Sequence, residues 1–580
     1  MGNNNDAAIV FLEKYFDIAF AAPDGVKKLR ELILTLAMQG KLVPQDINDQ
    51  PASELLKEIE KEKQRLVKDG KIKKSKPLPE IKLDEVPYNL PKGWEWVALI
   101  NIGNWAIGSG FPLNIQGDTT QEIFMCKVSD MNILGNEKYI HSVNNTISEE
   151  SAKKHKINIH ESGTIVFPKI GGAIATNKRR LLSRKTAIDN NCLGIMPHKQ
   201  IDVEWAYQLL SWFDFSKYQT GTSVPAISQG VIGGIVIGLP PLAEQRRIVA
   251  KIDELMARCD ELEKLRSDRD RKQITVHNSA LNRLLIAKEQ SDFNTSWQFI
   301  TQHFSELYSV KENVTELRKT ILQLAVMGKL VPQNINDQPA SELLKEIEAE
   351  KQRLVKKGKI KQSKPLPEIK PDEILYELPK GWKWVRLGNI SQIIGGFAYK
   401  SNSFQMEGTK QVLRLGNIRP DRLRLNENPV FINDSIGELT SEYCLLKNDI
   451  LITMTGTRAK RDYLYTVCIE KNPIDGVSLY LNQRVGAIRL FFESRYINMA
   501  LKVEVLKDVI FLSATGSANQ ANIGISNLRE WVLPLPPLAE QHRIVTKIDQ
   551  LMALCDNLEK QIDNANSKQT NLLNAVITKI

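Results

Sequence analysis

The sequence is poor in the residues from which metal and catalytic sites are usually built. Its 580 residues include seven histidines and six cysteines. No cysteine forms a C-x-x-C pair, and none has a histidine at zinc-ligand spacing. The cysteines are Cys126, Cys192, Cys259, Cys444, Cys468 and Cys555. This pattern argues against a zinc site and fits a protein of a reducing cytoplasm.

Long hydrophobic runs are also missing. The longest, VIGGIVIGL at 231–239, is far shorter than the roughly 20 residues that a membrane span needs, and it ends at Pro240. Near the amino terminus, Glu13 and Lys14 interrupt the run AAIVFLEKYF too early for a signal peptide. We therefore expect a cytoplasmic protein with no membrane partner.

The sequence further lacks the loops that bind cofactors. It has no G-x-x-x-x-G-K-[ST] phosphate loop, no G-x-G-x-x-G after a predicted strand, no H-E-x-x-H and no G-x-S-x-G. The strings LPPL at 239 and 535 lack the acid or amide and the aromatic residue of an adenine-methyltransferase loop. We expect a non-catalytic chain with no metal and no cofactor of its own. A fused methyltransferase or nuclease is the alternative, and it would methylate or cut DNA alone.

A long internal repeat is what the sequence does contain. Residues 40–82, which begin GKLVPQDINDQPASELLKEIE, match residues 328–370. The copies differ at Asp46/Asn334, Lys61/Ala349, Asp69/Lys357 and Lys74/Gln362. LPKGWEWV at 90–97 returns as LPKGWKWV at 378–385, and the passage LPPLAEQ that begins at Leu239 returns at Leu535. A period of about 290 residues is too long for a solenoid and indicates a duplicated large unit.

The segments between the repeats have diverged and contain short β-type runs. GTIVFP at 163–168 and DILITMTG at 449–456 have the length and composition of strands. The repeated parts show helical periodicity instead. In the last of them, apolar residues spaced four and three apart predict a coiled-coil seam: Ile544, Ile548, Leu551, Cys555, Leu558, Ile562, Ala565, Leu572 and Val576. The predicted fold class is mixed α/β, with two globular α/β domains separated by long antiparallel coiled-coil helices and related by pseudo-two-fold symmetry.

These patterns divide the chain into five parts. A helical region at 1–90 is followed by a globular domain at 91–238, a central helical region at 239–377, a second globular domain at 378–534 and a helix at 535–580. The first part corresponds to the second half of the central region, and the last part to its first half. We therefore expect the two ends to pack together and to rebuild a copy of the central region.

The chain is net basic, with a formal charge of +10, and both diverged domains carry basic clusters. These are NKRRLLSRK at 177–185, LRLGNIRPDRLRL at 413–425 and TGTRAKRDY at 455–463. Near the end of each domain lies a loop that begins with Thr-Gly, TGTSVPAIS at 220–228 and TGSANQANIGIS at 515–526. Arg can pair with guanine, Asn and Gln with adenine, and Lys with phosphate. The candidate DNA contacts are Lys178, Arg179, Arg180, Thr220, Thr222, Ser223, Arg414, Arg419, Arg458, Lys460, Arg461, Ser517, Asn519 and Gln520. For any one cluster a solvated surface is the alternative interpretation.

The doubled passage LPPLAEQ(R/H)RIV, with LPKGW(E/K)WV and the TG(T/S) loops, resembles the specificity subunits of type I restriction-modification systems. The resemblance covers essentially the whole chain. It implies two target-recognition domains, each reading one half-site of an interrupted, asymmetric double-stranded DNA sequence. It also implies that the repeated helices dock two modification subunits, which bind S-adenosylmethionine and methylate adenine at N6. Restriction subunits would add cleavage that depends on ATP and Mg.

The resemblance places the docking surface in the repeated passages and assigns no separate role to the doubled GKLVPQ block. The candidate partner-binding residues are Leu239, Pro240, Leu242, Gln245, Ile248, Leu535, Pro536, Leu538, Gln541 and Ile544. A coiled-coil scaffold that does not touch nucleic acid is a further alternative. Such a scaffold would show no salt-dependent binding to duplex DNA.

Overall fold

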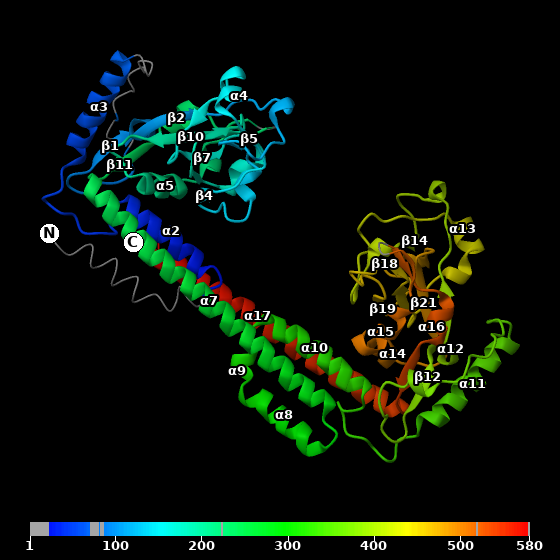
Figure 1. Cartoon of the computed structure of the whole chain (residues 1–580). Helices are drawn as coiled ribbons and strands as arrows, with labels where there is room; N and C mark the ends of the chain where they lie inside the picture. Colours follow the sequence, from blue (N-terminus) through cyan, green and yellow to red (C-terminus); the bar gives the residue numbers. More distant parts are fainter. Residues whose placement is uncertain (1–21, 70–80, 82–85, 222–223, 518–519, 578–580) are drawn as a thin grey trace. The chain divides into compact units, whose positions relative to one another are not determined.

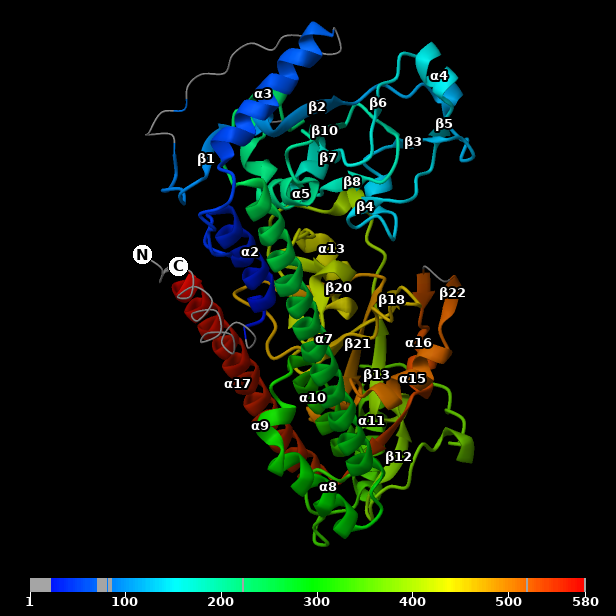
Figure 2. The same ribbon diagram turned by 60° about the vertical axis from the view of Figure 1, so that its left-hand side comes forward.

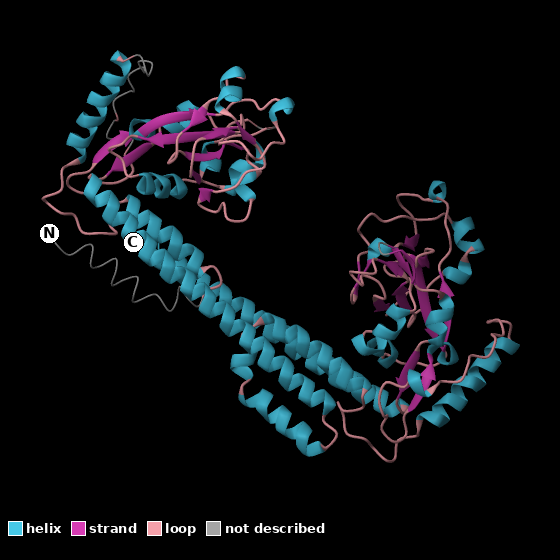
Figure 3. Cartoon of the chain, in the orientation of Figure 1, coloured by secondary structure: helices cyan, strands magenta, loops and turns pink. Residues whose placement is uncertain are grey.

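The chain divides into two compact units, and no sheet among the described residues spans both. The computed structural model describes residues 22–69, 81, 86–221, 224–517 and 520–577. One unit comprises Met1–Asp268 with Ala565–Ile580, and the other comprises Arg269–Asn564. Both boundaries fall inside long helices, α7 (Leu242–Ile286) and α17 (Leu538–Ile577) (Figure 1). Each unit combines a helical part with a strand-rich part (Figure 3).

In the first unit, helix α2 (Gly25–Met38) packs along the amino-terminal part of α7 (Figures 1 and 2). Arg30 donates a hydrogen bond to the Asp260 carboxylate at 2.6 Å, and Arg266 donates to the Ala22 carbonyl at 2.7 Å. Residue numbers therefore rise along α2 as they fall along α7, so the helices are antiparallel. Apolar residues three and four apart supply the buried stripe of α2, which contains Val26, Leu29, Ile33 and Leu36.

The end of α17 also belongs to the first unit. The Thr570 hydroxyl donates to the Asp24 carboxylate at 3.2 Å, and Lys28 Nζ donates to the Asn574 side-chain oxygen at 2.5 Å. Leu573 is buried in the same place. The amino-terminal and carboxyl-terminal ends of the described chain thus pack against each other within this unit.

The strand-rich part of the first unit holds two main sheets, ordered β2-β10-β7-β8-β4 and β5-β3-β9-β6. Their strands are β2 (Gly103–Ile107), β3 (Ile123–Cys126), β4 (Tyr139–Ile140), β5 (Thr146–Ile147), β6 (Ile159–His160), β7 (Ile165–Pro168), β8 (Arg180–Leu182), β9 (Thr186–Ile188) and β10 (Cys192–Pro197). The helices are α3 (Ala52–Lys68), α4 (Glu149–Lys154), α5 (Val203–Trp212) and α6 (Gln229–Gly233). Trp212 of α5 donates to the Thr35 hydroxyl of α2 at 3.1 Å, which joins the sheets to the helical part.

A separate two-stranded sheet closes this domain. Strand β1 (Glu95–Ala98) pairs antiparallel with β11 (Val236–Leu239), and α7 begins three residues later. The domain therefore starts and ends at one point, directly beside the first turn of the long helix.

The second unit repeats the helical arrangement. Helix α10 (Lys311–Val326) lies antiparallel to α17, since Lys311 pairs with Asp563 at 2.9 Å and Arg318 pairs with Asp556 at 2.6 Å. The other helices are α8 (Gln290–Gln302), α9 (Phe304–Leu307), α11 (Ala340–Lys356), α12 (Leu387–Ile390), α13 (Asp434–Leu439), α14 (Tyr496–Ala500), α15 (Glu504–Leu512) and α16 (Ile525–Glu530).

Its strands form one four-stranded sheet, β13-β21-β17-β19, and several small sheets. The four are β13 (Ser391–Gly395), β17 (Ile450–Thr453), β19 (Thr466–Cys468) and β21 (Val485–Leu490). The small sheets pair β12 (Lys383–Arg386) with β24 (Val532–Leu535), β14 (Lys410–Leu413) with β20 (Ser478–Leu481), and β15 (Ile418–Arg419) with β16 (Arg422–Leu423). A three-stranded sheet contains β18 (Thr455–Gly456), β22 (Thr515–Ser517) and β23 (Gln520–Asn522).

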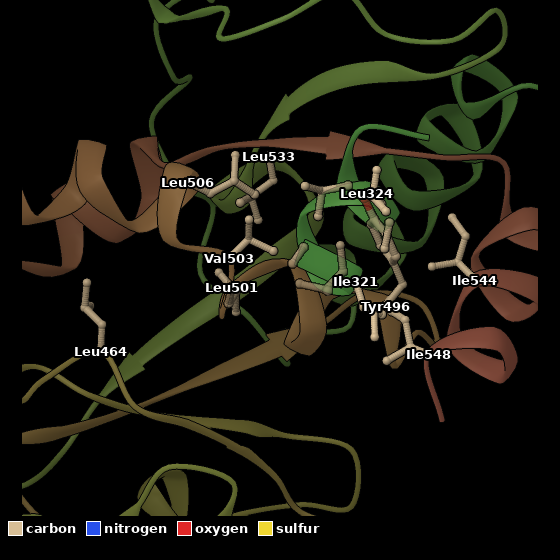
Figure 4. Packing of buried hydrophobic residues seen from close by; sticks show 14 of the residues in the cluster. Ile321, Leu324, Leu464, Tyr496, Leu501, Val503, Leu506, Leu533, Ile544 and Ile548 are labelled. Carbon is tan, nitrogen blue, oxygen red and sulfur yellow. The ribbon is translucent and has the colours of Figure 1, made fainter. Parts of the chain in front are cut away.

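One hydrophobic core joins helices and sheets in this unit. Ile321 and Leu324 of α10 share a buried cluster with Tyr496 of α14 and with Ile544 and Ile548 of α17 (Figure 4). The fully buried Tyr496 also donates its hydroxyl proton to the carbonyl of Pro534 at 3.1 Å. The strand-rich domain is therefore packed onto its helices as part of one core.

The two diverged domains have the same central topology. The antiparallel run β2-β10-β7-β8 in the first corresponds to β13-β21-β17-β19 in the second. The parallel pair β3/β9 corresponds to β14/β20. The prediction of two mixed α/β domains joined by long antiparallel helices is confirmed. The sequences conceal the shared topology because many apolar residues can fill the same buried strand position.

The coiled-coil seam predicted for α17 is correct at its start and wrong near its end. Ile544, Ile548, Cys555 and Ile562 are buried, whereas Ala565 and Leu572 are exposed and Leu573 is buried instead. A strict 3.5-residue spacing drifts around a helix of 3.6 residues per turn. On an α-helix, Leu573 lies about three turns beyond the buried Ile562 and shares its face, whereas Leu572 lies to one side of that face.

Candidate nucleic-acid interface and domain junctions

In the second domain, the three-stranded sheet β18-β23-β22 brings two predicted DNA-contacting segments together. The Thr455 hydroxyl donates to the Asn522 side-chain oxygen at 2.9 Å. Arg458 donates to the carbonyl of Ala514 at 2.7 Å. The basic TGTRAKRDY segment therefore lies beside the Thr-Gly hairpin, although about 60 residues separate them in the chain.

This hairpin surface exposes five of the predicted residues: Arg458, Lys460, Arg461, Ser517 and Gln520. Arg461 forms an ion pair with Asp508 at 2.6 Å and lies over the Phe511 ring at 4.9 Å from its centroid. Cationic, hydroxyl and amide groups on one exposed hairpin match the chemistry that contacts phosphates and base edges. Asn519 lies outside the described residues.

Arg414 and Arg419 belong to a different part of this domain, near β15. Both are half-buried, and they donate to the carbonyls of Asn428 at 2.5 Å and Ile418 at 2.9 Å. The structure therefore does not bring them together with the hairpin surface by any described contact.

In the first domain, a Thr-Gly loop also lies beside a strand end that leads into a basic segment, but it is formed by different residues. Ile227 N–H donates to the carbonyl of Lys169 at 2.9 Å, as Ile523 N–H donates to that of Met454 at 2.9 Å. Thr220, which is exposed, pairs across a bridge with Ala226. The loop thus lies beside the strand end that leads into the basic NKRRLLSRK segment. Thr222 and Ser223 lie outside the described residues.

The glycine of each Thr-Gly loop has a conformational reason. Gly221 has φ +92° and Gly516 has φ +98°, the left-handed region that favours glycine. A Cβ on Gly516 would also lie 2.2 Å from the carbonyl oxygen of Gln520. A side chain at either position would be strained, so the backbone conformation favours Gly in both loops.

The prediction that Arg179 contacts DNA is wrong. Its side chain is buried, and its guanidinium donates to the carbonyls of Leu210 at 3.0 Å and Phe213 at 3.1 Å. It lies over the ring of Phe215 at 3.9 Å from the centroid. Burial lowers the pKa of this guanidinium to about 9. Arg179 stabilises the domain interior and is not accessible to DNA.

The neighbours of Arg179 are only partly exposed. Arg180 donates to the carbonyl of Met131 at 2.9 Å, and the Lys178 ammonium contacts the Asn132 side-chain oxygen. Arg184 and Lys185, at the end of the same basic segment, are exposed. They were missed as candidates, although their position after the apolar pair of β8 is the signal that could have identified them.

The structure also contradicts most of the predicted partner-binding residues. Eight of the ten are buried within the chain, and Leu242 and Leu538 are half-buried. The buried ones are Leu239, Pro240, Gln245, Ile248, Leu535, Pro536, Gln541 and Ile544. A side chain without exposed surface cannot make a docking contact. Their repetition has an internal cause.

That cause is the junction between each domain and its long helix. Gln245 donates to the carbonyl of Pro240 at 2.9 Å and accepts from the Asp202 backbone N–H at 2.9 Å. In the second unit, Gln541 donates to the carbonyl of Pro536 at 2.8 Å and accepts from the Ser494 hydroxyl at 2.6 Å. A buried amide satisfied on both sides fixes the domain at the start of the helix.

A buried carboxylate completes each junction. Trp94 donates to Glu244 at 3.0 Å, and Trp382 donates to Glu540 at 2.9 Å. Burial raises the pKa of both carboxyls above the ordinary value of 4.5. The repeated LPKGW and LPPLAEQ passages therefore meet in space, and their joint repetition follows from this contact.

No group of three or more His, Cys, Asp or Glu side chains that could hold a metal ion occurs in the part of the chain that the structure describes. Among the described helices, none is long and apolar enough to cross a membrane.

Comparison with known proteins decides the family. The model of the type I restriction modification DNA specificity domain matches residues 91–269 and 379–565, one match for each domain with its junction. This chain belongs to the type I restriction-modification specificity subunits. Such subunits are the non-catalytic, DNA-recognising component of these systems, so the prediction that the chain is not an enzyme is confirmed.

Relatives of the specificity subunit match over nearly their full length. The EcoAI specificity subunit of Escherichia coli is 36% identical over 571 residues, covering 95% of this chain and 93% of the relative. The EcoEI specificity subunit of the same species is 33% identical, with 95% and 93% covered. Among solved structures, the HsdS subunit of Thermoanaerobacter tengcongensis is 19% identical with a TM-score of 0.40, covering 86% of this chain and 98% of that one.

Proposed function

We propose that this specificity subunit recognises an asymmetric, bipartite site in double-stranded DNA. Residues 91–238 read one half-site and residues 378–534 read the other. The observation that supports this is the shared hairpin feature, which carries different side chains in the two domains. Similar frames with unlike exposed residues are suited to two unlike base sequences.

Within each domain, the proposed contacts lie on the Thr-Gly loop and the basic segment beside it. In the second domain Arg458, Lys460, Arg461, Ser517 and Gln520 make the contacts. In the first domain, Thr220 on the loop and Lys178 and Arg180 of the basic segment take this role. The exposed Arg184 and Lys185 lie farther along the segment, beyond the pairing of β8 with the start of β7, and supply additional phosphate contacts. Lys and Arg contact phosphates and so fix the register of the domain on the duplex, while the amide and hydroxyl groups contact base edges.

The partners follow from the family. We infer that two modification subunits dock on this chain and supply S-adenosylmethionine and adenine N6 methylation. Restriction subunits supply ATP- and Mg-dependent cleavage, and this chain holds none of these cofactors. It acts in the cytoplasm, where its DNA and its partners are found.

Reconstitution tests this proposal. The purified chain should bind duplex DNA with an affinity that falls steeply with salt, because Lys and Arg displace counterions from phosphates. It should transfer no methyl group alone, and addition of the modification subunit and S-adenosylmethionine should methylate a two-part sequence motif. Methylation by the isolated chain, or a motif without a gap, would contradict the proposal.

A further inference from the structure

The doubled GKLVPQ block exposes the same aliphatic side chain in both units. Ile47, in the connection between α2 and α3, is 86% exposed, and Ile335, between α10 and α11, is 90% exposed. They occupy equivalent positions of the repeat. Among the described residues, they are the one pair of exposed large hydrophobic side chains that matches across the two copies.

Each connection is fixed by a two-point ion pair to the long helix beside it. Arg247 donates to both Asp49 oxygens at 3.2 and 2.6 Å, and Arg543 donates to both Asp337 oxygens at 3.2 and 2.6 Å. Both aspartates have nearly buried carboxylates. Paired guanidinium–carboxylate bonds of this kind hold the backbone in one orientation.

A local turn then orients the isoleucine. The Asn48 backbone N–H donates to the Asp46 side chain at 2.9 Å, and the Asn336 N–H donates to the Asn334 side chain at 3.0 Å. These Asx turns span the isoleucine in each copy. Ile47 and Ile335 therefore project from the same hydrogen-bonded turn, and a β-branched side chain has few rotamers to lose when a partner covers it.

Packing within the chain explains the identity of buried residues in the block, but not that of the isoleucine. The surface of the block tolerates change, because Asp46, Lys61 and Asp69, which differ from their counterparts, are exposed. An isoleucine at such a position gives the fold no burial energy and costs exposed apolar area. A contact outside the chain is the one role in which this exposed apolar side chain gains burial energy at both places.

We propose that the Ile47 turn and the Ile335 turn are equivalent docking points for two copies of one protein partner. Each isoleucine enters an apolar socket of the partner, and the exposed amides beside it hydrogen-bond at the rim. Two identical surfaces fit two copies of the same partner, whereas the two half-sites of DNA differ. This inference rests on the proposed function, in which that partner is the modification subunit.

The test counts partner copies on full-length variants. I47D, I335D and the double variant are mixed with the modification subunit of the same system, and the complexes are weighed by native mass spectrometry. The wild-type chain should bind two copies, each single variant one, and the double variant none. Titration should show at least about a tenfold weaker affinity at a changed site, the size expected for a buried anchor.

Exchanging residues between the copies supplies the matched control. D46N and N334D change the same turns, each to the residue found in the other copy, and both variants should bind two copies. I47L should restore binding that I47D loses, and all variants should unfold at the wild-type temperature because the side chain is exposed. Two bound copies with wild-type affinity in the double aspartate variant would overturn this inference alone. A wild-type chain that binds no modification subunit would contradict the proposed function as well.

Discussion

The indole N–H of Trp94 donates to the buried carboxylate of Glu244 across 150 residues of sequence, at 3.0 Å. The pair Trp382 and Glu540 repeats the contact at 2.9 Å. Each pair connects the opening passage of a domain to the first turn of the helix that follows it. The two halves of this specificity subunit are thus built on one junction, used twice.

Removal of the indole donor should lower the stability of the chain by the same amount in both copies. W94F and W382F each leave a buried carboxylate oxygen short of a partner, so each should lower the free energy of unfolding by about 1–3 kcal/mol. In the double variant the free energy of unfolding should fall by the sum of the two single losses, because the effects of mutations at distant sites are additive. Denaturant unfolding measures both. A loss confined to one copy would show that the junctions are not energetically equivalent.

The buried glutamates predict a pH dependence of stability. Because burial raises the folded-state pKa of Glu244 and Glu540, the folded chain binds more protons than the unfolded chain above pH 4.5. Their contribution to stability is therefore lost as pH rises through the folded pKa. Asp49 and Arg247 lie near Glu244 and act in opposite directions on its pKa.

The variant E244Q/E540Q should remove this dependence. Relative to wild type, its free energy of unfolding should rise between pH 5 and pH 8, whatever constant offset the amides introduce. Thermal unfolding across this range measures the difference. A difference that is flat with pH would contradict the raised pKa values.

The basic segment of the first domain should separate into a structural and a DNA-contacting residue. R179M leaves the carbonyls of Leu210 and Phe213 without their donor, so it should destabilise the domain by about 1–3 kcal/mol. R184A, at an exposed position, should change stability by less than about 0.5 kcal/mol.

For the affinity for duplex DNA, we expect the opposite order of effects: R184A should have the larger effect and R179M the smaller one. R184A should weaken binding and lower the salt slope by about one, as expected for loss of one phosphate contact. R179M should bind with wild-type affinity per folded molecule. Wild-type binding by R184A, or a specific binding defect in stable R179M, would place the DNA contacts elsewhere.

The sequence was sufficient for the fold class, the long repeated helices and the family, because the repeats copy long apolar stripes and whole passages. It was insufficient for the side chains of the site. Arg179 and Arg180 are adjacent in one basic run, yet Arg179, just before β8, is buried over the Phe215 ring, whereas Arg180 is half-buried. Gln245 and Ile248 repeat because of internal packing, and a sequence alone does not distinguish that cause from a shared partner.

The central claim is that each domain reads its own half-site, and exchange of one domain tests it most directly. Residues 98–238 would be replaced by the equivalent segment of another specificity subunit, with Trp94 and the LPPLAEQ passage kept so that the junction still forms. The methylated motif would then be mapped by sequencing DNA from cells that carry the hybrid chain with its modification subunit. We predict that one half-site changes while the other half-site stays the same. A hybrid that assembles and methylates but changes both half-sites, or neither, would contradict the account.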